Sequence, residues 1–312
     1  MPCCLVGSEM CIRDRMSAPQ PHLRLRNFIN SYIMLNHKNL ENISLLLDDI
    51  PKRWEKFSDI VLLPNSAFRG GHWEPIICDD FWLQICNILE VKRLARLGEI
   101  IGEKRESSVE ILIGNDDWVI RKESGIKYGY NITKCMFSSG NVNERRRMGE
   151  IVSKDEIIVD LFCGIGYYTL PILVKSQAKY VYSCEWNINA IDALKYNLKN
   201  NKVEERCTIF EGDNRTTTRD LFGVADRVLL GLLPTAEKSY DIALNCLKQS
   251  GGILHLHGLA PADDYQKLVI DTTNVLENLD SNYIVKSVNI NRIKSYAPHW
   301  DHLVLDIEID EV

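Results

Sequence analysis

Residues 157–169 read IIVDLFCGIGYYT and constrain the fold more than any other stretch of this chain. The short apolar run over residues 157–162, rich in β-branched side chains, is typical of a buried central strand of a parallel sheet. Gly164 and Gly166 follow at once, and glycine lets the backbone turn sharply and approach a ligand closely. The stretch therefore predicts an α/β, doubly wound, Rossmann-like sheet with a nucleotide-type site at this strand's carboxyl end.

The spacing around the turn distinguishes two kinds of cofactor. An NAD fingerprint requires a third glycine three residues after the second, and Thr169 stands there. Asp160 lies four residues before the first glycine, which gives the form D-x-F-x-G-x-G. A two-glycine turn can also simply close a strand-to-helix connection, so the turn alone leaves that alternative open. The complete form resembles motif I of the class I S-adenosylmethionine (AdoMet) enzymes.

Acidic or amide side chains also follow the next two predicted strands. The strand over residues 179–184 ends in Glu185, roughly the spacing at which a carboxylate binds ribose hydroxyls in a doubly wound fold. The strand over residues 208–210 leads into Asp213 and Asn214, a carboxylate and an amide suited to reading an adenine amino group. Each residue alone is equally compatible with a solvated turn. Their joint position at successive strand ends favours a cofactor site.

Composition sets broad limits on the class of protein. The 312 residues suffice for two domains, and no apolar run approaches the roughly 20 residues that span a bilayer, so we expect a cytoplasmic protein without membrane contact. The ten cysteines show no CxxC pair or Cys/His spacing typical of zinc, so no metal is expected. A net charge of −6 argues against non-specific coating of nucleic acid. Residues 1–15 look unlike the rest of the chain and resemble translated adapter sequence, so we expect them to be a non-native leader.

The order of predicted elements suggests a mixed α+β N-terminal domain over residues 16–135 and a catalytic domain over residues 136–312. In the first, we expect helices over residues 20–56 and 79–97, a strand over 59–64 and a joining β-meander over 109–137. In the second, strands and helices alternate from residue 157. Two final β-rich runs, 283–290 and 302–309, predict a C-terminal antiparallel hairpin.

The segment over residues 136–147, MFSSGNVNERRR, lies just ahead of the glycine strand. Together with the motifs after it, from about residue 50 to the C-terminus, it resembles the tRNA-modifying family that acts on the purine 3′ of the anticodon. That family divides into guanine-N1 methylation and aminocarboxypropyl transfer in wybutosine synthesis. Methylating relatives tend to carry an Asn-x-Pro sequence after the fourth strand, whereas Leu232 and Leu233 precede Pro234 here. This resembles the aminocarboxypropyl transferase branch, although two leucines packed on a helix would suit both branches.

The resemblance implies roles for individual residues. Ser138 and Arg145 would reach the methionyl end of AdoMet, Glu185 would hold the ribose, and Asp213 with Asn214 would read the adenine. Gly164 would give the backbone room beneath the cofactor, and Asp160 would orient that loop. No general base is identified, because an isolated histidine is more often packed or exposed than catalytic; the histidines near predicted strand ends are His255, His257, His299 and His302.

The implied reaction is transfer of the 3-amino-3-carboxypropyl group from AdoMet to C7 of 4-demethylwyosine at position 37 of tRNA(Phe), with release of methylthioadenosine. The alternatives are a tRNA guanine-N1 methyltransferase acting at position 37 and a non-catalytic RNA-binding subunit. The expected partner is tRNA(Phe) and not DNA, and the sequence says nothing of oligomeric state. An acidic chain must hold tRNA through a few clustered cations, for which we expect Lys92, Arg93 and Arg96, with Lys52 and Arg53 as the next candidates.

Overall fold

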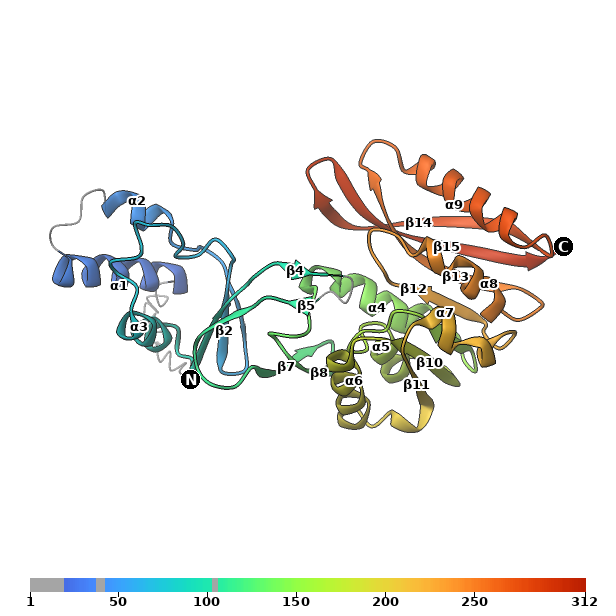
Figure 1. Cartoon of the computed structure of the whole chain (residues 1–312), viewed down its shortest axis with the longest axis horizontal. Helices are drawn as coiled ribbons and strands as arrows, with labels where there is room; N and C mark the ends of the chain where they lie inside the picture. Colours follow the sequence, from blue (N-terminus) through green and yellow to red (C-terminus); the bar gives the residue numbers. More distant parts are fainter. Residues whose placement is uncertain (1–19, 38–42, 103–105) are drawn as a thin grey trace, which may run out of the picture.

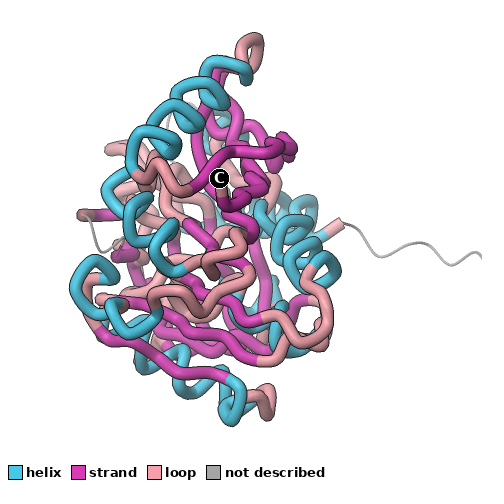
Figure 2. Tube along the Cα trace, turned by 90° about the vertical axis from the view of Figure 1, so that its right-hand side faces the viewer, coloured by secondary structure: helices cyan, strands magenta, loops and turns pink. Residues whose placement is uncertain are grey.

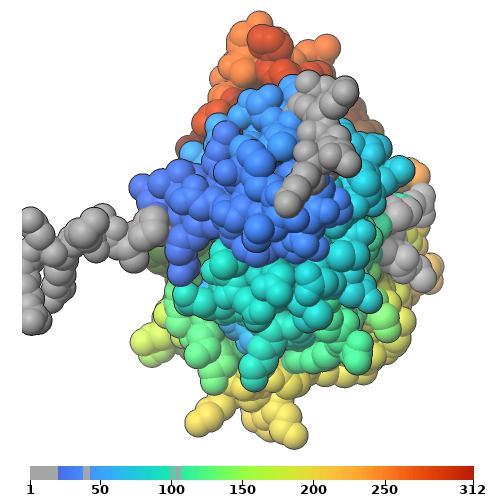
Figure 3. All heavy atoms as spheres, turned by 90° about the vertical axis from the view of Figure 1, so that its left-hand side faces the viewer, coloured from blue at the N-terminus to red at the C-terminus, as the bar shows by residue number. Residues whose placement is uncertain are grey.

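The computed structural model describes residues 20–37, 43–102 and 106–312, so the expected leader, residues 1–15, lies outside the described residues. The molecule is elongated (Figure 1), with an N-terminal part at one end and a larger C-terminal part at the other. Viewed from the N-terminal end (Figure 3), the early residues in blue and cyan cover much of the face, and C-terminal residues in orange and red emerge above them. Among the described residues no helix has the length and apolar character needed to cross a membrane.

The N-terminal part is a small sheet covered by helices. Its four strands have the order β1-β2-β3-β6, with β2 and β3 parallel. The aromatic rings of Phe68, Trp73 and Phe81 pack edge-on in its core, with the first two ring centroids 4.9 Å apart. The elements are α1 (Pro21–Asn36), α2 (Ile43–Asp48), β1 (Glu55–Phe57), β2 (Ile60–Leu63), α3 (Asp79–Leu89), β3 (Arg93–Arg96), β4 (Ile100–Ile101), β5 (Glu106–Ser107) and β6 (Glu110–Ile113).

The predicted helix over residues 79–97 is wrong in its second half. Helix α3 ends at Leu89 because Glu90 takes a left-handed conformation with φ 56°, and the chain then enters β3 beside β2. As a result Arg93 binds Asp59 at 2.6 Å, and Arg96 binds Glu110 at 2.7 Å and the carbonyl of Ala67. These guanidinium groups are largely buried, so the predicted tRNA-binding patch that contained them is wrong too.

The predicted β-meander is also wrong in its pairing. Strand β6 pairs with β3 of the N-terminal sheet, whereas β7 (Trp118–Glu123) and β8 (Ile126–Asn131) form a separate hairpin. The hairpin packs on the C-terminal part, because the Gly129 amide donates to Asn197 at 2.6 Å and the Trp118 ring meets Tyr196 edge-on. Residues 133–137 form no strand, since the Cys135 amide closes a turn on the carbonyl of Asn131.

The C-terminal part contains a seven-stranded sheet of order β11-β10-β9-β12-β13-β15-β14. Its first five strands are parallel, and β15 and β14 add to the edge in antiparallel fashion, which confirms the predicted α/β fold with its hairpin. Figure 2 shows helices on both sides of these strands. The elements are α4 (Val142–Ile151), β9 (Ile157–Asp160), α5 (Thr169–Lys175), β10 (Tyr180–Glu185), α6 (Ile188–Asn200), β11 (Cys207–Glu211), α7 (Asn214–Thr217), β12 (Arg227–Leu230), α8 (Tyr240–Cys246), β13 (Gly252–Pro261), α9 (Tyr265–Leu279), β14 (Tyr283–Ala297) and β15 (Trp300–Glu311).

The order of the strands determines where a ligand can bind. From β9 the chain continues to β10 on one side, while β12 joins the other side of β9, so the topological switch lies between β9 and β12. In register, Asp160 at the end of β9 lies beside Ser183 of β10 and Leu229 of β12. Ligands of open α/β sheets bind outside the carboxyl ends of the strands at such a switch.

Candidate active site

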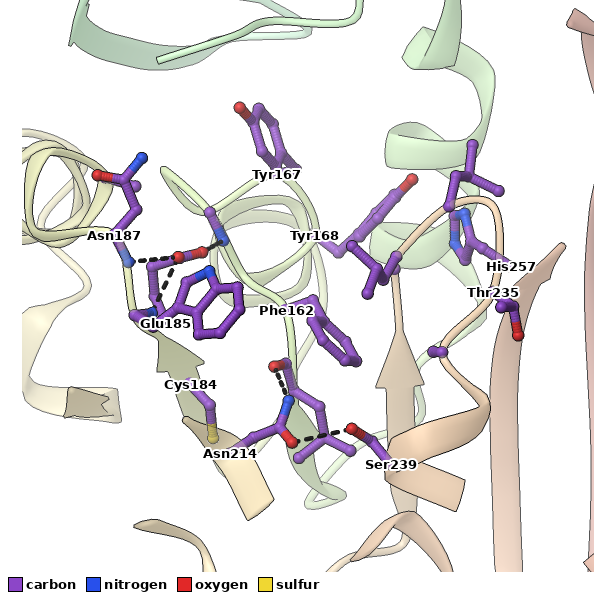
Figure 4. A pocket seen from close by; sticks show the side chains of 18 of the residues that line it. Phe162, Tyr167, Tyr168, Cys184, Glu185, Asn187, Asn214, Thr235, Ser239 and His257 are labelled. Atoms are coloured by element: carbon purple, nitrogen blue, oxygen red, sulfur yellow. Dashed lines mark hydrogen bonds between the residues drawn. The ribbon is translucent and has the colours of Figure 1, made fainter. Parts of the chain in front are cut away.

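A cavity of about 1060 Å³ lies at this edge of the sheet. Segments that follow β9, β10, β11 and β12 line one side, and side chains from β13, β14 and β15 line the other. Figure 4 shows Glu185 and His257 on opposite sides of it. All six residues that the sequence predicted for the cofactor line this cavity: Ser138, Arg145, Gly164, Glu185, Asp213 and Asn214.

Glu185, at the end of β10, is held by three hydrogen bonds. Its carboxylate accepts hydrogen bonds from the backbone amides of Gly164 at 2.8 Å, Trp186 at 2.9 Å and Asn187 at 2.8 Å (Figure 4). Burial raises the pKa of this carboxyl group, and the three amides oppose that rise. A carboxylate has about four acceptor sites, so Glu185 retains capacity for a ligand hydroxyl while it ties the glycine turn to the end of β10.

The glycine turn depends on backbone freedom at one position in particular. Gly164 has φ 56°, and a Cβ atom built there would lie 2.3 Å from the ring of Tyr167. Beneath the turn, Asp160 accepts from the hydroxyl of Thr169 at 2.8 Å and from the backbone amide of Phe162 at 3.4 Å. Full burial raises the pKa of Asp160 to about 7. These contacts agree with the predicted role of Asp160 in orienting the loop.

The third strand end holds the two remaining predicted residues in different ways. Asp213 begins α7 by accepting from the backbone amide of Arg215 at 3.0 Å, and its ion pair with the Arg215 side chain lowers its pKa. Asn214 is buried: its amide donates to the carbonyl of Leu161 at 2.9 Å and accepts from the hydroxyl of Ser239 at 3.0 Å (Figure 4). Asn214 therefore joins the segments that follow β9, β11 and β12.

Arg145 and Ser138 lie at the other end of the cavity. The guanidinium of Arg145 is 2% exposed and binds both carboxylate oxygens of Glu123, at 2.6 and 2.7 Å, and the carbonyl of Ser138 at 2.9 Å. The Ser138 hydroxyl accepts from Nζ of Lys294, at 2.8 Å. Arg145 thus fixes the Ser138 segment, and its direct contact with a cofactor stays a prediction.

Lys294 packs closely against a glycine at this position. A Cβ atom at Gly140 would lie 3.0 Å from Cδ and 3.1 Å from Nζ of Lys294, so a larger residue would crowd the lysine and require it to shift by a few tenths of an ångström. Sequence analysis did not place Lys294 in the site, because it comes from the C-terminal antiparallel hairpin, more than 150 residues after Ser138 in the chain. Trp186, next to the predicted Glu185, also lines the cavity and was missed.

The segment after β12 forms an aliphatic stretch of the wall. Gly231, Leu232, Leu233 and Pro234 all line the cavity, and the Leu233–Pro234 peptide bond is cis. Leu232 and Leu233 are half-buried, with Leu232 packed against the core cluster around β12. The alternative in which these leucines only pack in the interior is therefore incomplete, because they also face the ligand space.

Comparison with known families decides the class of protein. Residues 119–290 match the family described as "TRM5/TYW2 methyltransferase domain", and residues 40–117 match the "TYW2 N-terminal domain". The chain belongs to the TRM5/TYW2 family. Because the N-terminal match is to TYW2 in particular, the predicted wybutosine branch of the family is confirmed as well.

Named relatives agree with this assignment. A "tRNA wybutosine-synthesizing protein 2/3/4" from Oryza sativa subsp. japonica is 43% identical over an alignment of 309 positions, which covers 97% of this chain and 29% of that protein. The chain thus spans under a third of the length of this relative. The TYW2 structure from P. horikoshii in complex with MeSAdo has 31% identity and a TM-score of 0.75, covering 91% of this chain and 99% of its own. TYW2 from M. jannaschii in complex with AdoMet has 28% identity and a TM-score of 0.66, covering 83% and 100%.

The residues around the cavity fit AdoMet, the cofactor of this family. Glu185 offers acceptor capacity for hydroxyls, and the Trp186 side chain adds an aromatic surface beside it. At the far end, Lys294 supplies a positive charge next to the Ser138 hydroxyl. The Oδ1 atom of Asn141, another lining residue, is buried without a hydrogen-bond partner, as expected for a group that meets a ligand donor.

Proposed function

We propose that this protein transfers the 3-amino-3-carboxypropyl group of AdoMet to C7 of the wyosine precursor at position 37 of tRNA(Phe), in the cytoplasm, with release of methylthioadenosine. The observation that carries the proposal is the aliphatic wall after β12. Methylating relatives are expected to hold a ring N–H with an asparagine there, whereas Leu232 and Leu233 offer only hydrocarbon. Such a wall suits an acceptor whose nucleophile is a ring carbon. The names of the relatives support the same reaction.

The residues of this chain contribute by positioning. AdoMet, when bound, supplies a sulfonium whose attached carbons are electrophilic. Glu185 would hold the ribose, and Lys294 would pair with the carboxylate of the methionyl arm, with Ser138 fixing the ammonium. Holding that arm in near-attack geometry selects which carbon meets the acceptor, and such positioning can supply most of the rate enhancement. Arg145 would act on the same arm through the Ser138 segment.

The two ends of the molecule would then have different roles in the reaction and in tRNA binding. The C-terminal part, from residue 136 onward, would carry the reaction, and the N-terminal part would contact the tRNA. Lys52 and Arg53 are exposed and remain candidates for phosphate contacts. At the cavity, the cations Arg215 and Lys238 line the wall and would face an incoming anticodon strand.

A co-product assay tests the proposal. Purified protein is incubated with AdoMet and tRNA(Phe) that carries 4-demethylwyosine, and the small molecules are separated by chromatography. Methylthioadenosine together with a modified base supports aminocarboxypropyl transfer. S-adenosylhomocysteine would instead indicate methyl transfer, and tRNA binding without either co-product would indicate a non-catalytic subunit. The variant Glu185→Ala serves as the control, because its weakened cofactor binding should reduce either product when AdoMet is below saturation.

A further inference from the structure

Two histidines on neighbouring antiparallel strands form a direct pair in the wall of the cavity. His257 of β13 and His302 of β15 have their Nδ1 and Nε2 atoms 2.9 Å apart. Both side chains are buried, at 1% and 0% exposure, and both residues line the cavity. Figure 4 shows His257 beside Tyr168 and Thr235, on the side of the cavity away from Glu185. We call this pair the histidine dyad.

The dyad leaves two ring nitrogens without partners. Within the described residues, five buried side-chain nitrogen or oxygen atoms have no hydrogen-bond partner, and three of the five belong to residues of this cavity: Nε2 of His257, Nδ1 of His302 and Oδ1 of Asn141. Buried polar atoms are nearly always paired, so such a cluster calls for a ligand-related explanation. His255, two residues before His257, has both ring nitrogens paired, with Asp306 at 2.5 Å and Arg227 at 2.6 Å.

The bond between the rings couples their outer nitrogens. If His257 Nδ1 donates to His302, the outer atom of His257 is a lone pair and the outer atom of His302 carries a proton. If His302 Nε2 donates instead, the two outer atoms exchange these roles. A proton taken at one outer nitrogen is therefore matched by a proton released at the other. The dyad can pass a proton on without keeping a positive charge.

The surroundings favour this uncharged state. Burial lowers the pKa of His257 well below its ordinary value and lowers the pKa of His302 to about 4. Lys294 on β14 and Arg147 on α4 add to the lowering, His255 on β13 acts in the same direction, and Asp306 on β15 opposes it only weakly. Both imidazoles are thus neutral near pH 7, and a relay that releases one proton as it takes another avoids the charged ring that burial disfavours.

We propose that the histidine dyad is the proton relay of the reaction, with His257 Nε2 taking the hydrogen that the acceptor ring carbon loses. The inference rests on the proposed function, since a ring-carbon nucleophile must shed its hydrogen to restore the aromatic ring. We assign the first proton transfer to His257 because its ring centroid lies 5.1 Å from that of Tyr168. The Tyr168 ring in turn lies beside Gly231, which follows β12 and begins the aliphatic wall.

Atoms and electrons balance along this route. The bond that forms joins C7 of the base to Cγ of the aminocarboxypropyl group. The bond that breaks is the one between Cγ and the sulfonium sulfur, and its electron pair stays on sulfur in methylthioadenosine. The C7–H electron pair returns to the ring, and the proton passes to His257 Nε2. The bridging proton moves to His302 Nε2, and the Nδ1 proton of His302 passes to a water molecule that enters the cavity, which His302 lines. Exchange with water, once product has left the cavity, restores the starting tautomer.

Deuterium at C7 of the acceptor base tests the relay. The variants are His257→Gln and His302→Asn, and the matched control is His255→Gln, a buried histidine outside the cavity lining. We expect both dyad variants to lose roughly 100-fold or more in turnover, the usual contribution of a general base, and to show a deuterium isotope effect larger than that of the unmodified protein. The control should lose stability while its isotope effect stays unchanged. Equal isotope effects in all four proteins would overturn the relay.

A second measurement needs no variant and no turnover. In the ¹⁵N-histidine spectrum of the unmodified protein near pH 7, His257 and His302 should both be neutral and share one tautomer, both Nδ1–H or both Nε2–H. An imidazolium signal from either residue would overturn the proposal. Failure of the proposed function is recognised separately, since the unmodified protein would then release no methylthioadenosine. Methylthioadenosine release with unchanged isotope effects would keep the function and reject the relay alone.

Discussion

Replacement of Asp160 by asparagine should make the protein less sensitive to rising pH. Asp160 is fully buried at the end of β9, and burial raises its pKa from 3.8 to about 7. In the folded state it therefore binds a proton more tightly than in the unfolded chain. Stability falls with rising pH wherever the folded state binds more protons, so ionisation of Asp160 destabilises the fold progressively between about pH 4 and pH 7.

The size of the effect follows from the same values. One pKa unit corresponds to about 1.4 kcal/mol, so the full rise is worth about 4 kcal/mol. Between about pH 5 and pH 8 the unfolding free energies of Asp160→Asn and unmodified protein should diverge by about 3 kcal/mol in favour of the variant. The amide can keep both contacts, with Oδ1 accepting from Phe162 and Nδ2 donating to Thr169, whose hydroxyl then bonds Ser183.

Urea denaturation at several pH values, without AdoMet, measures this divergence. Asp220→Asn, which replaces an exposed aspartate, serves as the control and should follow the unmodified protein at every pH. A constant difference between Asp160→Asn and unmodified protein from about pH 5 to pH 8 would show that Asp160 does not change its ionisation in this range. The account of the buried carboxyl group beneath the glycine turn would then be refuted.

Three further predictions concern the cofactor and the tRNA. Glu185→Ala should weaken AdoMet binding by about 1.5 to 3 kcal/mol in calorimetric titration, and Asp213→Ala by less, because Asp213 is partly exposed and paired with Arg215; unchanged affinity in Glu185→Ala would contradict the ribose role. Glutamine at both Lys52 and Arg53 should reduce the salt dependence of tRNA affinity by about one to two phosphate contacts, and an unaltered slope would move the patch elsewhere. Arg145→Ala should lose product with little loss of AdoMet affinity, and Glu123→Gln should lose product equally if Arg145 acts through the Ser138 segment.

The meeting of the predicted cofactor residues in one cavity could be foreseen because the information for it is local. In a parallel sheet the residue that follows each strand lies at one edge, so the glycine turn, Glu185 and Asp213 could be assigned to one place from chain position alone. Their hydrogen bonds could not be predicted in the same way. The guanidinium of Arg145 pairs with Glu123 because the β7–β8 hairpin packs against α4, and no local sequence pattern encodes that packing.

The errors in the N-terminal part have a related cause. Residues 93–96 continue the apolar spacing of α3 and read as helix, but in the fold Leu94 and Ala95 are fully buried as part of β3. Tertiary pairing with β2 outweighs the local helical pattern there. The same pairing buries Arg93 and Arg96, so these two residues do not form the tRNA-binding surface patch that was inferred from charge alone.

The acceptor end of the cavity shows what the antiparallel edge adds to this fold. The parallel strands supply the glycine turn after β9, Glu185 at the end of β10 and Asp213 after β11, and these residues are proposed to hold the cofactor. Lys294 and His302 lie opposite each other on β14 and β15, in register, and β15 also pairs with β13, which carries His257. The charge beside Ser138 and the histidine dyad therefore depend on one hairpin. Since that hairpin closes the same cavity, a shift in its register would move both groups at once. The antiparallel edge of the sheet, rather than the glycine turn, would therefore determine which group is transferred and where the proton of the acceptor base goes.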